Sequence, residues 1–152
     1  MPDVVDQATR SRMMRGIKGK DTQPELRVRR RFHAAGLRYR VHRRDLPGTP
    51  DIVFPGIRTV VFVNGCFWHQ HPGCKLAAVP GTNAKFWADK LGANIVRDGR
   101  TYQQLTDLGW DTIVVWECAN EAQLAEVVRD LQVRRAHLLE SRPPTNRIGH
   151  LW

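Results

Sequence analysis

The chain has 152 residues, and its 24 Lys and Arg against 15 Asp and Glu give a net charge of +9. This length fits one domain, and the apolar share of 41% excludes wholesale disorder. No apolar run is long enough to span a bilayer, and no helix pairs a lysine-rich face with a continuously apolar one. The expected partner is therefore nucleic acid and not a membrane.

The first half of the chain is expected to form two helices and three strands. Residues 8–18, ATRSRMMRGIK, are a short basic segment with helical potential. Residues 20–36 predict a clear helix, because Thr22 is a good N-cap, Pro24 suits the first turn and Gly36 stops the helix. Pro and Gly separate three strand-like runs, of which the last two predict a hairpin: Leu37–Val41, Asp51–Phe54 and Thr59–Val63.

The second half is expected to alternate helix, strand and helix. A long helix is predicted over Asn83–Leu108, with two neighbouring faces: Ala84, Ala88, Leu91 and Ile95 on one, and Trp87, Lys90, Asn94 and Arg97 on the other. WDTIVVWEC (110–118) has the character of a buried strand. Residues 121–139 form an amphipathic helix with core spacing at Leu124, Val127, Val128 and Leu131. This alternation predicts an α/β fold with a mixed sheet flanked by helices. We expect a single domain over residues 1–140, a basic N-terminal segment over 1–20 and a C-terminal tail over 141–152.

The stretch VNGCFWHQHPGC (63–74) contains a candidate metal site. Cys66, His71 and Cys74 have the spacing Cys-x4-His-x2-Cys, and zinc takes thiolates and imidazoles in tetrahedral sets of four. Cys118, just past a strand, is the remaining cysteine. Three unrelated buried cysteines are the alternative, but none of them sits in an apolar run. His69 competes with His71 as the imidazole ligand. An odd cysteine count and an N-terminus unlike a signal peptide predict reduced thiols and a cytoplasmic protein.

An acid and a histidine lie close to this stretch. Asp51 in LPGTPDIVF opens an apolar strand whose hairpin partner ends at Val63 and Asn64. One carboxylate with a backbone carbonyl and waters suffices to hold Mg²⁺ against a scissile phosphate. His69 is the histidine left over once zinc has taken His71, and an imidazole is suited to deprotonating an attacking water. Taken alone, Asp51 is better explained as a turn residue after proline, and His69 can be explained as an ordinary loop residue.

Several motifs, taken in order, resemble the very-short-patch-repair (Vsr) endonucleases. They are ATRSRMMRGI with DTQPE, LPGTPDIVF, FVNGCFWHQH, FWADKLGANIVRD and LGWDTIVVWEC, and they run from about Ala8 to Cys118. The resemblance implies a restriction-endonuclease-like (PD-(D/E)xK-type) core with a structural zinc. It also implies an enzyme that nicks one DNA strand 5′ to the thymine of a T:G mismatch, which arises when 5-methylcytosine deaminates.

Carried onto this chain, the resemblance implies that Asp51 binds Mg²⁺ with the main-chain carbonyl of Val63. His69 would then be the catalytic base, and Glu25 would support the water shell of the metal. By sequence alone, Glu25 fits equally well as the second half of a capping box with Thr22. The zinc set would be Cys66, His71, Cys74 and Cys118.

Two features depart from the family pattern. Asn64 stands where many members have histidine, and asparagine can donate to phosphate but cannot shuttle a proton. HPGC is one residue longer than the usual His-x-Cys, which bears on the zinc geometry.

The aromatic pair between the metal ligands suggests how a mispair is read. Phe67 and Trp68 would insert between base steps, where unstacking costs less at a mismatch, and a loop tied by metal would lose little entropy on insertion. The basic N-terminal segment would contact DNA or else dock on the core. Met14 and Ile17 would enter the other groove, and the surrounding basic residues would bind phosphates: Arg10, Arg12, Arg15 and Lys18. By resemblance, Trp87 stacks against the wedge, and Lys90 and Asn94 contact the mispair.

Double-stranded DNA with a mismatch is the expected partner of a monomeric, cytoplasmic and nucleoid-associated enzyme. Mismatch-repair proteins are expected as further partners. Two rivals remain open: a non-catalytic zinc-stabilised DNA-binding module, for which Asn64 would mark lost activity, and a nickase for a different mispair or lesion.

Overall fold

A mixed four-stranded sheet forms the centre of residues 21–141, the part of the chain that the computed structural model describes. Its spatial order is β1 (Arg40–Val41), β2 (Ile52–Phe54), β3 (Thr59–Asn64) and β4 (Asp111–Trp116). β1, β2 and β3 pair antiparallel, and β4 runs parallel to β3. The prediction of a mixed sheet and of a β2–β3 hairpin is confirmed. Two predicted segments lie outside the described residues. They are the basic segment at residues 8–18, which includes Met14, Arg15 and Ile17, and the C-terminal tail beyond Ser141.

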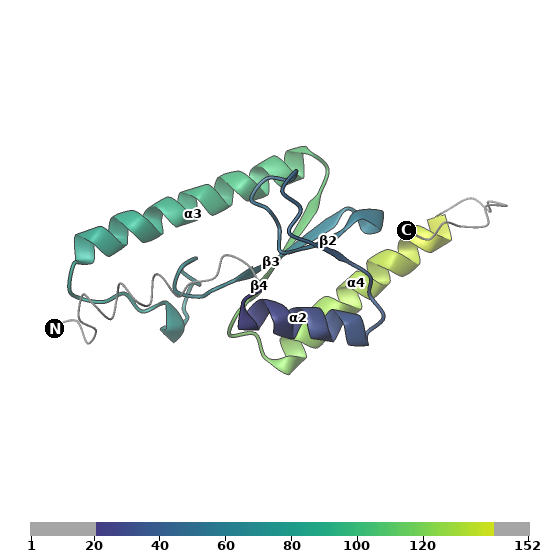
Figure 1. Cartoon of the computed structure of the whole chain (residues 1–152), viewed down its shortest axis with the longest axis horizontal. Coiled ribbons are helices and arrows are strands. Elements are labelled where there is room, and N and C mark those ends of the chain that lie inside the picture. The colour runs from purple at the N-terminus through teal and green to yellow at the C-terminus, as the bar shows by residue number, and fades with distance from the viewer. Residues whose placement is uncertain (1–20, 142–152) are drawn as a thin grey trace.

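Helices cover both faces of the sheet (Figure 1). α3 (Ala84–Asp107) lies on one face, while α2 (Gln23–Ala34) and α4 (Glu121–Ser141) lie together on the other. Each face has its own apolar cluster. The α2–α4 side contains Val28, Phe32, Ile52, Phe54, Val61, Val115, Leu124, Val128 and Leu131. The α3 side contains Leu46, Val53, Val60, Phe62, Leu105 and Trp110. Because both faces are covered, β2 and β3 are apolar at nearly every position and do not alternate.

Local signals at both ends of α2 are realised as the sequence predicts. Thr22 is the N-cap, and its hydroxyl accepts a hydrogen bond from the Glu25 amide at 3.3 Å. Gly36 adopts a left-handed φ of +74°, and the Leu37 amide donates to the Phe32 carbonyl at 3.0 Å. This arrangement is a Schellman motif. It explains why the first predicted strand is too long: Leu37 belongs to the helix end and the core, and only Arg40–Val41 pair with β2.

One further prediction is wrong in detail. The strand at 110–118 was expected to be buried, but of its residues in β4 only Val115 is buried, because the strand lies at the sheet edge with β3 as its neighbour. On α3, Ala84, Ala88 and Ile95 are exposed. The buried residues of that helix are Trp87, Leu91 and Leu105. The core-spaced residues of α4 are placed as predicted, with Val127 half-buried. No helix within residues 21–141 is long and apolar enough to cross a bilayer.

Two leucines on α4 provide a matched test of this architecture. Leu124 is 0% exposed and Leu139 is 54% exposed. Leu124→Ala should lower the free energy of unfolding by about 3 kcal/mol through lost burial and a residual cavity. Leu139→Ala should change it by less than about 0.5 kcal/mol. Urea denaturation followed by circular dichroism measures both, and equal losses would contradict the placement of α4.

Candidate active site

A cleft of about 890 Å³ opens where β2 begins and β3 ends. The antiparallel register pairs Ile52 with Val61, so Asp51 lies beside the last residues of β3. The start of α2 and the loop after β3 complete the walls. The cleft therefore brings together sequence-predicted residues from three segments: Glu25, Asp51, Val63, Asn64, Phe67, Trp68 and His69.

Asp51 is a largely buried carboxylate with an unusual pKa. Its Oδ2 accepts a hydrogen bond from the Val63 amide at 2.7 Å. Burial raises the pKa of Asp51 to about 6; the Val63 amide lowers it, and the neighbouring Glu25 carboxylate raises it further. A cation beside Asp51 would offset the cost of burying this charge. The residues present fit a hard divalent cation, which prefers carboxylate and carbonyl oxygens.

Glu25 is 2% exposed and belongs to an ionic network at the cleft. Its carboxylate contacts the Arg29 guanidinium and lies 2.6 Å from Nε2 of His42. Arg29 also reaches Asp21 at 2.9 Å. These contacts direct the carboxylate toward the cleft, while the Glu25 amide alone fulfils the capping role with Thr22.

His42 was not identified from the sequence. It follows β1 with a left-handed φ of +51°, and its amide donates to the Asp51 carbonyl at 3.4 Å. A non-glycine residue in this conformation is strained, a condition often found at functional sites. Nothing in RVHRRD distinguishes His42 from a solvated loop residue, so no sequence signal was available.

His69 is oriented by a carboxylate on α3. Its Nδ1 lies 2.6 Å from Oδ2 of Asp98. With Nδ1 engaged, Nε2 is the ring nitrogen left to accept a proton. Asp98 was also missed, although a signal existed: it lies one helical turn beyond Asn94, on the face that turns toward the cleft.

Asn64 is 3% exposed at the end of β3. Its side-chain amide donates to the Tyr102 hydroxyl at 2.9 Å. Burial raises the pKa of Tyr102; the Asn64 hydrogen bond lowers it, and the Asp98 and Asp51 charges raise it. Asn64 is thus held in place by α3 at the wall of the cleft.

The four predicted zinc ligands form one cluster. Their candidate ligand atoms all lie within 4.8 Å of one another, in the set Cys66, His71, Cys74 and Cys118. Nδ1 of His71 is 3.6 Å from Sγ of Cys66 and 3.4 Å from Sγ of Cys118. Ligands around a tetrahedral zinc would be separated by roughly these distances, about 3.3–3.8 Å. His69 is not part of the cluster, which favours His71 among the two candidate histidines.

Two features shape this cluster. The His71 ring stacks on Trp116 with centroids 4.2 Å apart. Gly73 adopts a φ of +69°, so the extra residue in HPGC is accommodated by a conformation suited to glycine.

Aromatic side chains form a second cluster beside the cleft. The ring centroids of Phe67 and Trp68 are 4.9 Å apart, and both rings contact Trp87, at 5.2 and 6.0 Å. The Asn94 side chain donates to the Trp68 carbonyl at 3.0 Å, which ties the loop to α3. Lys90 is exposed on the same helix. Phe86, half exposed and packed on Trp87, extends the cluster and was not predicted.

Comparison with known proteins identifies relatives of this chain. Residues 2–75 match the family model of DNA mismatch endonuclease Vsr. The chain is 43% identical over 134 residues to the type II nicking enzyme V.XorIIP of Xanthomonas oryzae pv. oryzae, covering 84% of this chain and 98% of that protein. It is 47% identical over 119 residues to DNA mismatch endonuclease Vsr of Escherichia coli, covering 78% of this chain and 76% of that protein.

A third relative is the type II nicking enzyme V.NmeAIP of Neisseria meningitidis, 40% identical over 118 residues and covering 78% of this chain and 84% of that protein. The resemblance read from the motifs is thereby confirmed. The chain belongs to the Vsr family, and it is a DNA endonuclease.

Proposed function

We propose that this protein is a Mg²⁺-dependent mismatch endonuclease that nicks one strand 5′ to the thymine of a T:G mispair, as in very short patch repair. The observation that carries the proposal is the cleft itself. It places a buried carboxylate, Asp51, and a carboxylate-oriented imidazole, His69, beside an aromatic pair on one loop. This combination suits hydrolysis of a phosphodiester next to a distorted base step.

Asp51 and the main-chain carbonyl of Val63 would hold the magnesium ion, with Glu25 supporting its water shell. The raised pKa of Asp51 supports this assignment, because a buried carboxylate gains from a compensating cation. When bound, the ion would supply charge stabilisation for the scissile phosphate. Glu25 is held by Arg29 and His42, which keep its carboxylate facing Asp51.

His69 would take the proton of the attacking water at Nε2. Asp98 holds Nδ1, which fixes the tautomer and stabilises the imidazolium that forms. Asn64 has no proton to give at neutral pH, and we assign it a role in positioning. Its amide is bound to Tyr102, which fixes the end of β3 beside Val63.

The Cys66–His71–Cys74–Cys118 cluster would hold a structural zinc. Three thiolates and one imidazole leave no open coordination position. The ion would stiffen the loop that bears Phe67 and Trp68, which act as the wedge with Trp87 behind them. Lys90 and Asn94 would contact the mispair. Met14, Arg15 and Ile17 of the N-terminal segment would bind the duplex as well.

We further propose a monomer made of one domain over residues 1–140, acting in the cytoplasm on the nucleoid, with mismatch-repair proteins as additional partners. The net charge of +9 supports association with DNA.

A panel of duplexes carrying every mispair tests the specificity. With Mg²⁺ we expect the T:G duplex to be nicked 5′ to the thymine at least about tenfold faster than any other. Asp51→Asn should abolish nicking and leave T:G binding nearly intact, because Asp51 acts on the metal. Two of the three relatives named above are called type II nicking enzymes and not mismatch endonucleases. Faster nicking of a duplex other than T:G would therefore indicate a nickase with a different substrate. Asp51→Asn nicking at the wild-type rate would refute the assigned chemistry.

Asp51→Asn should abolish nicking, but the raised pKa of Asp51 predicts that the same substitution stabilises the fold. Between the unfolded value near 3.9 and the folded value of about 6, the folded state binds more protons, so stability falls as pH rises through this window. In metal-free buffer, Asp51→Asn should raise the free energy of unfolding by up to about 3 kcal/mol above pH 6 and leave it unchanged near pH 4. Urea denaturation across this range measures the difference.

The control for that experiment is Asp45→Asn. Asp45 is exposed, and its hydrogen bond with Arg43 lowers its pKa, so this variant should not gain stability as pH rises. An Asp51→Asn effect independent of pH would contradict the proposed burial of charge.

Metal analysis tests the cysteine cluster. Purified protein should contain about one zinc per chain, and His71→Ala should lower both the zinc content and the melting temperature. His137→Ala, on the exposed part of α4, should change neither. Zinc-free wild-type protein with an unchanged melting temperature would refute a structural metal.

A further inference from the structure

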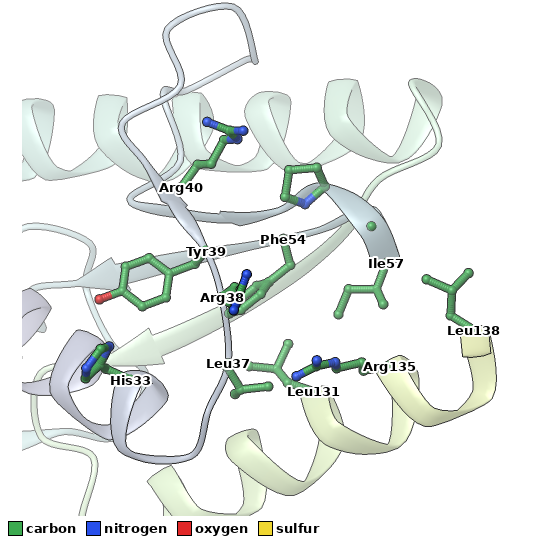
Figure 2. Close-up of a pocket in the computed structure, with 12 residues that line it drawn as sticks. His33, Leu37, Arg38, Tyr39, Arg40, Phe54, Ile57, Leu131, Arg135 and Leu138 are labelled. Atoms are coloured by element: carbon green, nitrogen blue, oxygen red, sulfur yellow. The ribbon is translucent and has the colours of Figure 1, made fainter. Parts of the chain in front are cut away.

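A second hollow, of about 500 Å³, lies at the end of the sheet opposite the cleft (Figure 2). α2 extends from the cleft, which Glu25 lines, to the hollow, which His33 lines. β2 does the same, with Asp51 at the cleft and Phe54 at the hollow. Glu25 and His33 are eight residues apart on α2, a rise of about 12 Å, and the hollow and the cleft share no lining residue. A ligand in this hollow would therefore not compete for the cleft.

The floor of this hollow is apolar. It is built from the start of the segment after α2, from the β2–β3 connection and from α4, in the set Leu37, Tyr39, Phe54, Ile57, Leu131 and Leu138. Phe54 and Tyr39 also stack edge to face at 6.3 Å, which makes one wall rigid. A preformed apolar hollow of this size is suited to one or two large apolar side chains.

The rim is strongly cationic. His33, Arg38, Arg40 and Arg135 line the hollow, and within residues 21–141 no Asp or Glu does. Some arginines of the described chain contact carboxylates: Arg27 and Arg31 with Glu121, Arg29 with Glu25, Arg43 with Asp45, and Arg134 with Asp111. Among the described residues, Arg38 and Arg40 have no such ion pair, and neither do Arg30 and Arg129, which lie outside the hollow. Arg135 instead donates to the Gly36 carbonyl at 3.2 Å, which closes the wall between α4 and α2.

We propose that this hollow, the arginine pocket, docks an acidic segment of another protein through one large apolar anchor residue. The uncompensated Arg38 and Arg40 are complementary to carboxylates, and the apolar floor is complementary to the anchor. A nucleic-acid backbone would leave that floor unused, because its phosphates would contact the rim alone. The chain's own residues 142–152, RPPTNRIGHLW, contain two arginines and no acid, so their charge is unfavourable here.

The pocket and the cleft can be occupied together. A protein bound at the arginine pocket would therefore remain attached while the endonuclease holds its DNA, at the far side of the sheet from the nick. This inference does not depend on the lesion specificity or the metals proposed above.

The test uses the full chain and a fluorescent peptide of about ten residues in which glutamates flank a Phe-Leu pair. Fluorescence anisotropy should show binding that the double variant Arg38→Glu/Arg40→Glu weakens at least about tenfold. Arg30→Glu/Arg129→Glu reverses two exposed arginines on α2 and α4 outside the pocket. This control should weaken binding less than about threefold. Leu138→Lys should also weaken peptide binding, because it places a charge in the apolar floor of the pocket.

Three kinds of outcome would overturn the proposal. The first is a lack of charge specificity: equal weakening by the two arginine pairs, or equal binding of a peptide with lysines in place of the glutamates. The second is loss of duplex binding in Arg38→Glu/Arg40→Glu but not in the control, which would assign the pocket to nucleic acid. The third is tighter peptide binding in Leu151→Ser/Trp152→Ser, which would assign it to the C-terminal tail. Nicking of the preferred duplex should be unchanged in both arginine variants.

Discussion

The pairing of β2 with β3 is the constraint on which the candidate site depends. The register of Ile52 with Val61 brings Asp51 to the Val63 amide, and the next residues of the chain form the loop with the cysteines and aromatics. A shift by one residue would turn Asp51 to the other face and move the apolar residues of β2 out of their clusters. The same apolar packing that stabilises the sheet therefore aligns the carboxylate.

The cleft combines groups that are costly to bury with contacts that limit this cost. Glu25 is nearly inaccessible; the adjacent Arg29 guanidinium compensates its charge, and the His42 ring contacts the same carboxylate. Asp51 has one amide donor, which leaves its ionised form less favourable than in water. Such an imbalance is typical of a site that is completed by a ligand. The same side chain would thus influence both the stability of the fold and the affinity for the proposed cation.

The local elements of this fold could be predicted because their signals are local. Thr22 and Gly36 mark the ends of α2, and Pro and Gly separate the strands of the hairpin. The strand before β2 was overestimated because Leu37 was needed to end the helix, a role that its β-strand propensity does not reveal. Burial of β4 was overestimated because an apolar run does not indicate whether a strand has one neighbour or two.

The family resemblance made it possible to predict which residues form the candidate site. The contacts that hold those residues in place could not be predicted. His42 and Asp98 reach the cleft from a loop and from α3, and each is defined by a contact with a residue distant in sequence. Periodicity and spacing carry no information on such pairs.

The position of Cys66 and Cys118 has a consequence for how the chain unfolds. The two residues follow β3 and β4, neighbouring parallel strands, and the chain between them includes the whole of α3. A bond through a shared ion would act as a cross-link that closes this long loop and lowers the chain entropy of the denatured ensemble. The sheet edge, the aromatic loop and α3 would then separate from the rest cooperatively, so that one dissociation event would remove the wall of the cleft that the aromatic loop forms.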